Sequence, residues 1–86
     1  MIVTKQMVAE KIAAHLQHRI SLPELVDWAE NAMMDGEFDE KDAATISGVV
    51  ARLGVSDVRA FGLTWTDCEE LLARLGFSAR VEIVAA

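Results

Sequence analysis

The sequence predicts a mainly α-helical protein: a compact bundle of four main helices and one short helix, followed by a C-terminal β-strand. Apolar residues recur every three or four positions through most of the 86-residue chain. Ser, Thr or Asp stands where each helix would begin, and Gly where most would end. The last ten residues change to strict alternation, which is the period of a strand. A chain of this length is expected to form one domain, residues 1–86.

The first two helices are predicted from their caps and apolar stripes. Thr4 is the expected N-cap of a helix over residues 4–19, where Val8 begins a row of apolar residues four apart. The second helix begins at Ser21, because Glu24 at the third helical position completes a capping box. Its predicted buried stripe consists of Leu22, Leu25, Val26, Ala29, Ala32 and Met33.

The stretch MMDGEFDEKDA, residues 33–43, separates the second helix from the third and puts five acids around one glycine. Gly36 is expected to give the backbone freedom to leave the second helix, and Asp39 to be the next N-cap. The third helix should close at Gly54, with a buried stripe of Ile46, Val49, Val50 and Leu53.

A short helix and a fourth main helix follow. Ser56 is expected to cap one helical turn, DVRAF, which ends at Gly62. Either Thr64 or Thr66 can begin the fourth helix, because both T-x-x-D and T-x-x-E fit a capping box. Gly76 should end it, and its predicted stripe is Trp65, Cys68, Leu71, Leu72 and Leu75.

The C-terminal stretch FSARVEIVAA predicts a strand with one apolar face, formed by Phe77, Ala79, Val81 and Ile83. A lone strand cannot satisfy its backbone hydrogen bonds, so it needs a partner. The options are the N-terminal residues 1–3, the same strand of a second copy, or an edge strand of another protein. Pairing across a homodimer is favoured, because 31 large apolar residues are many for so short a chain.

The net charge of −6 comes from one segment. Residues 24–42 hold eight acids against Lys41 alone, a net of −7, and the other residues hold six acids and seven bases, a net of +1. Such a segment repels nucleic-acid phosphates and attracts a basic protein. The structural alternative is that these acids are only the solvated faces of two helices.

The expected location is the cytoplasm. No apolar run approaches the roughly 18 residues of a membrane span, and the N-terminal residues lack the order of a signal peptide. The single cysteine, Cys68, cannot form an internal disulfide and fits a reducing compartment.

The residues predict no catalytic, cofactor or metal site. Residues 31–42 match part of an EF-hand loop, but Met33 stands at its third position, where calcium needs an oxygen ligand. His15 and His18 lie three apart without a third ligand residue to complete a metal site. Cys68 falls on an apolar stripe, where a buried hydrophobe is expected rather than a nucleophile.

MMDGEFDEKDA, the following apolar helix and LGVS together resemble the helix, D-G turn and helix unit of tellurite-resistance TerB-like domains, over residues 30–56. The resemblance implies a small helical core, and no metal site is carried over from it. In size, helicity and charge the chain also resembles small bacterial helical proteins, including acidic immunity proteins that cover a toxin's basic active site.

DNA binding is the alternative function. VVARLGVSDVRAF has the rhythm of a helix-turn-helix, and LLARLGFSARVEIV is similar to the helix-then-strand tail of some antitoxins. Arg52, Arg59, Arg74 and Arg80 could form a basic patch, yet the recognition helix would offer only one arginine, beside Asp57.

The favoured function is a non-enzymatic protein-interaction module, immunity-like or antitoxin-like, with an acidic face that binds a protein partner. The residues predicted to bind it are Glu24, Asp27, Trp28, Glu30, Asp35, Glu37, Asp39 and Glu40.

Overall fold

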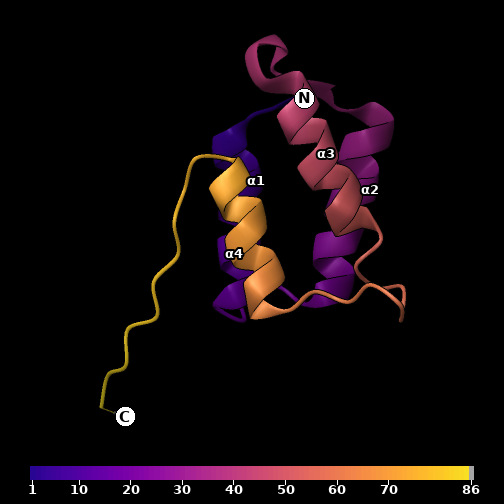
Figure 1. Ribbon diagram of the computed structural model, residues 1–86. Helices are drawn as coiled ribbons and strands as arrows, with labels where there is room; N and C mark the ends of the chain where they lie inside the picture. The colour runs from indigo at the N-terminus through magenta and orange to yellow at the C-terminus, as the bar shows by residue number, and fades with distance from the viewer. Residues whose placement is uncertain (86) are drawn as a thin grey trace.

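Four α-helices and a two-stranded sheet make up the computed structural model, which describes residues 1–85. The helices are α1 (Lys5–Leu16), α2 (Leu22–Asp35), α3 (Ala43–Gly54) and α4 (Trp65–Arg74). The strands are β1 (Ile2–Val3) and β2 (Glu37–Phe38), and a 3₁₀ turn η1 (Glu40–Asp42) precedes α3. Figure 1 shows α2 beside α3 and α1 beside α4, with the C-terminal segment running away from the bundle. The mainly helical prediction is confirmed.

Three predicted helix starts are confirmed by their cap hydrogen bonds. Thr4 Oγ1 accepts from the Met7 N–H at 3.1 Å and so begins α1. Ser21 and Glu24 form the reciprocal capping box of α2, each accepting from the other's backbone N–H at 3.3 Å. Thr64, not Thr66, caps α4, because its hydroxyl accepts from Asp67 N–H at 3.1 Å and the Asp67 carboxylate accepts in return at 2.9 Å.

The end of α4 is also as predicted. Gly76 adopts φ +88°, a left-handed conformation that residues with a Cβ rarely adopt. Its N–H donates to Ala73 O at 3.0 Å, and the Phe77 N–H donates to Leu72 O at 2.9 Å. This pair of hydrogen bonds is a Schellman motif, which satisfies the carbonyls that the helix end would leave free.

The sheet pairs the N-terminal residues with the acidic turn, so they are not the partner of the C-terminal segment. Ile2 and Val3 lie parallel to Glu37 and Phe38, and the Glu37 N–H donates to Met1 O at 2.9 Å. Residues 77–85 form no strand in the part of the chain that the structure describes. The chain leaves α2 next to the buried Val3, whereas it leaves α4 heading away from the N-terminus (Figure 1).

Gly36 is needed for close packing rather than for unusual dihedral angles, contrary to the prediction. Its φ and ψ are −83° and 151°, which any residue adopts. A Cβ built there would lie 2.5 Å from Ala32 O and 3.0 Å from Val3 Cγ2. The glycine therefore lets the first residue after α2 pass close to both the helix end and β1.

One apolar core joins all four helices and Val3. Its buried residues are Val3, Val8, Ala9, Ile12, Leu25, Ala29, Ala32, Ile46, Val49, Val50, Leu53, Cys68, Leu71, Leu72 and Leu75. Among the predicted core residues, Met33 is 46% exposed and Trp65 is 39% exposed, and Leu22 is half-buried outside this cluster. The small Ala29 and Ala32 occupy the centre of α2's buried stripe, so Met33 falls at the rim of that stripe.

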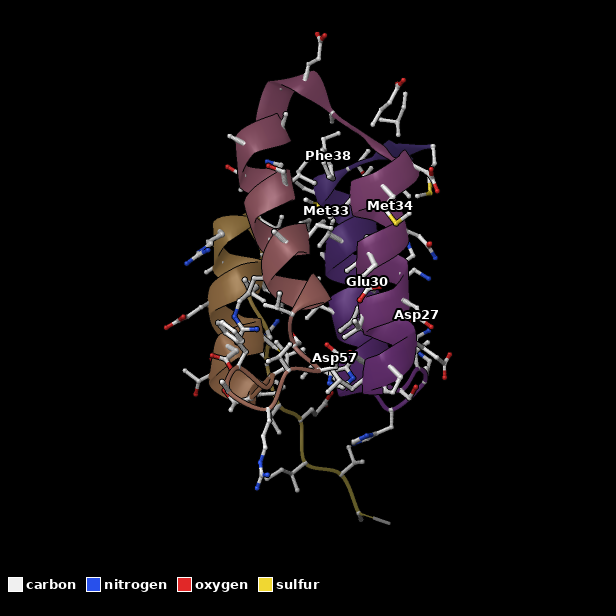
Figure 2. All side chains as sticks on the ribbon, turned by 90° about the vertical axis from the view of Figure 1, so that its right-hand side faces the viewer. Asp27, Glu30, Met33, Met34, Phe38 and Asp57 are labelled. Atoms are coloured by element: carbon white, nitrogen blue, oxygen red, sulfur yellow. The ribbon has the colours of Figure 1, made fainter. Side chains whose placement is uncertain are left out.

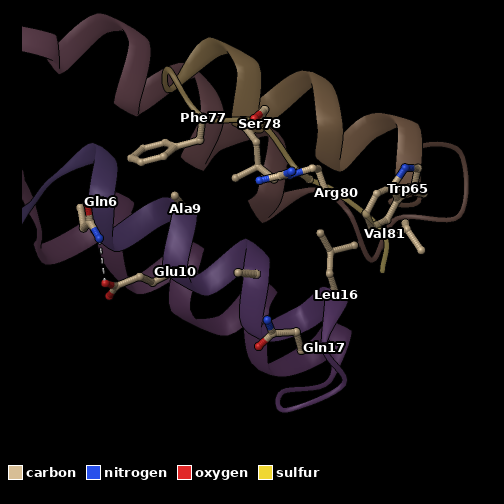
Figure 3. Close-up of a pocket in the computed structure, with 13 residues that line it drawn as sticks. Gln6, Ala9, Glu10, Leu16, Gln17, Trp65, Phe77, Ser78, Arg80 and Val81 are labelled. Atoms are coloured by element: carbon tan, nitrogen blue, oxygen red, sulfur yellow. Dashed lines mark hydrogen bonds between the residues drawn. The ribbon is translucent and has the colours of Figure 1, made fainter. Parts of the chain in front are cut away.

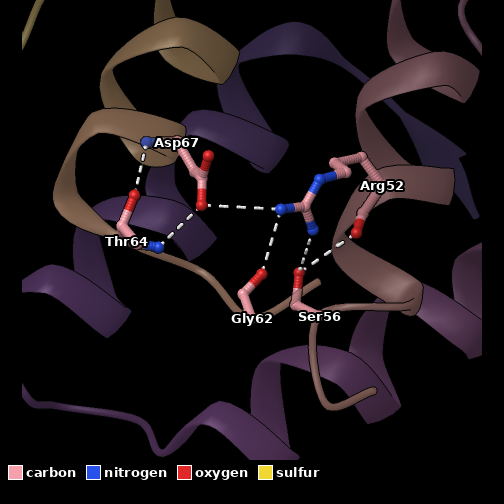
Figure 4. A network of polar contacts seen from close by, with 5 residues as sticks. All are labelled: Arg52, Ser56, Gly62, Thr64 and Asp67. Atoms are coloured by element: carbon pink, nitrogen blue, oxygen red, sulfur yellow. Dashed lines mark hydrogen bonds and ion pairs between the residues drawn. The ribbon is translucent and has the colours of Figure 1, made fainter. Parts of the chain in front are cut away.

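The predicted short helix over residues 57–61 is wrong. The chain there makes successive turns, in which the Val58 N–H donates to Val55 O and the Phe61 N–H donates to Val58 O. The Gly62 N–H also donates to Val58 O at 3.1 Å. Arg52 contacts Ser56 and Gly62, the residues on either side of this segment (Figure 4).

Among residues 1–85, the structure has no helix long and apolar enough to cross a membrane.

Candidate interaction face on helix α2

Helix α2 presents most of the predicted acids on its outer side. Asp27, Glu30 and Asp35 are exposed, because the core stripe occupies the opposite side of the helix. Figure 2 shows Asp27 and Glu30 on the same side of the molecule as Met33 and Met34. The predicted acids of α2 are therefore brought onto one surface.

The following turn extends this surface. Glu37 lies exposed in β2 directly after α2, and Glu40 lies exposed in η1. The backbone of Glu37 is fixed by its hydrogen bond to Met1 O, so its side chain projects from an ordered position. We call the surface formed by Asp27, Glu30, Met33, Met34, Asp35 and Glu37 the α2 face.

Two of the predicted partner-binding acids have structural roles instead. Glu24 Oε1 accepts hydrogen bonds from both the backbone N–H and the hydroxyl of Ser21. Asp39 is half-buried, and its Oδ1 accepts from the Lys41 N–H at 3.3 Å as the cap of η1. Both carboxylates are engaged at element starts, so neither is included in the α2 face.

The acids of the α2 face have no ion-pair partner within residues 1–85. The two ion pairs of this region join Lys5 to Asp42 at 3.6 Å and Arg52 to Asp67 at 3.5 Å. The exposed carboxylates on α2 and on the strand β2 that follows it thus keep their charge uncompensated. A surface with this charge attracts cations and repels polyanions.

Trp28, the predicted aromatic anchor, lies away from the centre of this face. Its ring is half-buried against the core, and Lys11 Nζ of α1 lies 5.8 Å from the ring centroid. The lysine covers part of the indole by a cation–π contact. Trp28 therefore helps to fasten α1 to α2 and offers little surface to a partner.

Two exposed methionines supply the apolar surface of the α2 face, a role that the sequence prediction gave to Trp28. Met33 is 46% exposed and Met34 is 78% exposed, and Figure 2 shows both beside Glu30 on α2. Met1 and Ile2 are also exposed, and β1 holds them next to Glu37 at the same end of the molecule. The sequence itself indicates that Met33 and Met34 are not both buried. Two consecutive residues on a helix point about 100° apart, so they cannot both lie at the centre of one buried stripe.

A second surface feature is an open groove of about 510 Å³ between α1 and α4 (Figure 3). Leu16 of α1, Trp65 and Leu72 of α4, and the C-terminal residues Phe77 and Val81 supply most of its large apolar side chains. Its polar side chains are Gln6, Glu10, Gln17, Ser78 and Arg80, of which Gln6 Nε2 donates to Glu10 Oε1 at 3.2 Å. The groove therefore combines a band of large apolar side chains with a polar rim.

The remaining candidates for chemistry have structural surroundings. Cys68 is 1% exposed, and burial raises the pKa of its thiol to about 11, so little thiolate exists at neutral pH. Within residues 1–85, no group of three or more His, Cys, Asp or Glu side chains lies close enough to hold a metal ion.

The predicted arginine patch is not available as a unit. Arg52 donates to Ser56 Oγ and to Gly62 O, each at 3.0 Å, and pairs with Asp67 (Figure 4). Residues 57–61 form turns, so the recognition helix that the DNA-binding alternative needs does not form there. Arg59, in those turns, is exposed.

Comparisons of the chain with protein-family models, with curated proteins and with solved structures found no match.

Proposed function

We propose that the protein is a cytoplasmic, non-enzymatic interaction module that binds a basic, partly apolar segment of another protein through the α2 face. One observation carries this proposal: uncompensated carboxylates surround two exposed methionines on a single ordered helix. The acids attract a cationic partner, and the methionines give it apolar surface to cover.

The two kinds of side chain have different effects on binding. Carboxylates at the edge of an interface mainly raise the association rate and select against wrong partners. Methionine side chains are flexible and polarisable, so Met33 and Met34 can adapt to the apolar residues of a partner. The α2 backbone stays in place during binding because Ala29 and Ala32 are fully buried in the core and α2 packs along α3.

The partner class follows from this chemistry. A helical or extended segment with lysines or arginines flanking apolar residues matches the acids and methionines of the α2 face. An acidic face of this kind fits the immunity-like or antitoxin-like class, in which a small acidic protein covers a basic surface of a toxin, and we propose that class for this protein.

Homodimerisation through residues 77–86 is the second part of the proposal. Val81 is 68% exposed, Ile83 94% and Val84 75%, which is unfavourable for apolar side chains that no other segment covers. Because this segment leaves the bundle at the α1 and α4 side (Figure 1), a dimer formed through it leaves the α2 face free for a partner protein.

The proposal can be tested with a labelled synthetic helical peptide that carries lysines on one face and leucines on the other. Fluorescence anisotropy measures its affinity for the wild-type protein, for D27K/E30K on α2, and for the control E69K/E70K on α4. Each variant raises the net charge by four, and all four substituted acids are exposed. We expect D27K/E30K to weaken binding at least about tenfold and the control to weaken it less than about threefold. Equal loss in both variants, or no binding by the wild type, would overturn the proposal.

A further inference from the structure

Residues 78–85 follow α4 as extended chain without a backbone hydrogen bond to any part of residues 1–85. Their apolar and polar side chains alternate, which is the pattern of a strand with one face covered. The first of these residues, 78–81, line the groove beside α1 and α4, and Figure 1 shows the segment trailing away from the bundle toward the C-terminus. The segment has the sequence of a strand and lacks a strand to pair with.

We propose that residues 77–85 pair antiparallel with the same residues of a second copy of this chain, with Val81 on the two-fold axis. The inference rests on the dimer part of the proposed function and is independent of the α2 face. Two features select this register from the others: the alternation of the side chains, and the placement of the two charges.

Alternation requires that the axis pass through a residue rather than between two residues. In antiparallel strands, directly opposite residues project from the same face. An axis at a residue sets odd-numbered residues against odd-numbered ones, which gathers Phe77, Ala79, Val81 and Ile83 on one face. If the axis instead passes between two residues, odd-numbered residues of one copy lie opposite even-numbered residues of the other. Val81 and Ile83 would then share a face with the charged residues of the second copy.

Charge then selects among the axes near the centre of the strand. An axis at Arg80 sets it opposite its own copy, and an axis at Glu82 does the same for two glutamates, so both registers place like charges together. An axis at Val81 sets Arg80 opposite Glu82 of the second copy, and by symmetry it does so twice. This register also uses all nine residues from Phe77 to Ala85, since Phe77 then lies opposite Ala85 of the second copy.

The apolar face of the paired strands has a surface to cover. Residues 77–81 line the groove between α1 and α4, with Phe77, Ala79 and Val81 alternating with Ser78 and Arg80, and Ala79 packs against the core (Figure 3). Pairing would fix the extended segment over this groove and bury exposed apolar surface of Trp65 and Phe77, which are 39% and 38% exposed. The Arg80 side chain would then turn from the groove to the opposite face of the ribbon, where it joins Glu82.

Cysteine cross-linking of the full chain tests the register directly. In Val81→Cys, the two sulfurs would face each other across the axis, with Cβ atoms about 5 Å apart before adjustment. In Ile83→Cys, the two cysteines would lie four residues apart along the ribbon, or roughly 13 Å. We expect mild oxidation to convert most of V81C, and little of I83C, into a covalent dimer on a non-reducing gel. Buried Cys68 serves as the wild-type background. Equal cross-linking of both variants would overturn the register.

A charge exchange tests the pairing without new cysteines. Arg80→Glu places two acids opposite each other, and Glu82→Arg places two arginines opposite each other, whereas R80E/E82R restores both attractive pairs in reversed sense. By light scattering, we expect each single variant to raise the dimer dissociation constant at least about fivefold and the double variant to return it to the wild-type range. A double variant as weak as the single variants would contradict the pairing. A wild-type chain that is monomeric at all concentrations would overturn the dimer, while the peptide titration would still report on the α2 face.

Discussion

Arg52 Nη2 donates to the carbonyl oxygen of Gly62 at 3.0 Å, which ties the last turn of α3 to the residue that lies two positions before the α4 cap. Its Nη1 donates to the hydroxyl of buried Ser56 at 3.0 Å, and Asp67 lies 3.5 Å from Nη2 (Figure 4). A single side chain therefore holds an irregular connection of ten residues between two helices.

Loss of Arg52 should destabilise the protein more than loss of an exposed arginine. Arg52→Met leaves Gly62 O and Ser56 Oγ without their charged donor, which we expect to cost about 2 kcal/mol of unfolding free energy. Arg59→Met removes the same charge from an exposed turn and should change stability by less than about 0.5 kcal/mol. Urea unfolding measures both, and equal effects would contradict the role assigned to Arg52.

Asp67 should make stability depend on acid pH. The backbone N–H of Thr64 is the largest cause that lowers the pKa of this carboxyl below its ordinary 3.8, followed by the Thr64 hydroxyl; Arg52 adds a smaller effect, and burial opposes them. A lowered folded-state pKa means that the charged form stabilises the fold above the unfolded pKa, and that this contribution is lost as pH falls through the folded pKa. The stability advantage of wild type over Asp67→Asn should therefore be largest above the ordinary pKa of 3.8 and shrink as the pH falls below it.

The control for Asp67 is Glu69→Gln, which removes an exposed carboxylate from the same helix. Thermal melts at several pH values should show a larger pH-dependent difference from wild type for Asp67→Asn than for this variant, which removes no cap hydrogen bond. If the two differences vary equally with pH, the cap hydrogen bonds do not depend on the charge.

The Cys68 thiol should be unreactive in the native protein. Burial raises its pKa to about 11, and the side chain lies among the core leucines of α4. At about pH 8, a thiol-specific reagent should label the native chain at least a hundredfold more slowly than the urea-unfolded chain, because thiolate content and access both fall. Since the chain has one cysteine, the labelling rate reports this site alone. Fast labelling of the native chain would place Cys68 outside the core.

Two glycines should respond in opposite directions to the same substitution. Gly36→Ala puts a Cβ 2.5 Å from Ala32 O, a backbone atom that cannot move alone, and we expect a loss of about 2 kcal/mol or more. Gly48→Ala adds a Cβ to an exposed position of α3 with nothing within 4 Å, and should gain about 0.5 to 1 kcal/mol. Chemical denaturation of the two variants gives both values, and the same sign for both would contradict the packing described around β1.

Helix starts could be predicted from the sequence because a cap is a local contact. Thr4, Ser21 and Thr64 each bind a backbone N–H three residues away, so spacing alone reveals them. The pairing of β1 with β2 could not be predicted in this way, since two residues carry no measurable period. The turns at residues 57–61 could not be predicted, because Arg52 stabilises this connection through a hydrogen bond to a residue ten positions away in the sequence.

The candidate site was predicted in part for a similar reason. Charge segregation is visible in the sequence, and the structure places Asp27, Glu30 and Asp35 on one exposed side of α2. The sequence indicates Trp28 as the apolar centre of the face, whereas in the structure α1 covers part of its ring. Which edge of the α2 stripe α1 covers depends on tertiary packing and cannot be seen in the sequence. Met33 and Met34 are exposed because Leu25, Val26, Ala29 and Ala32 form the buried side of α2.

The most direct test of the α2 face is a two-dimensional ¹H–¹⁵N NMR titration of the full chain with the lysine-leucine peptide. If the account is right, the largest chemical-shift changes will fall on the amides of residues 27–37, with small changes along α4. Changes concentrated along α1 and α4, at the groove beside Trp65 and Phe77, would contradict it, because the peptide would then bind the apolar groove and not the acidic face.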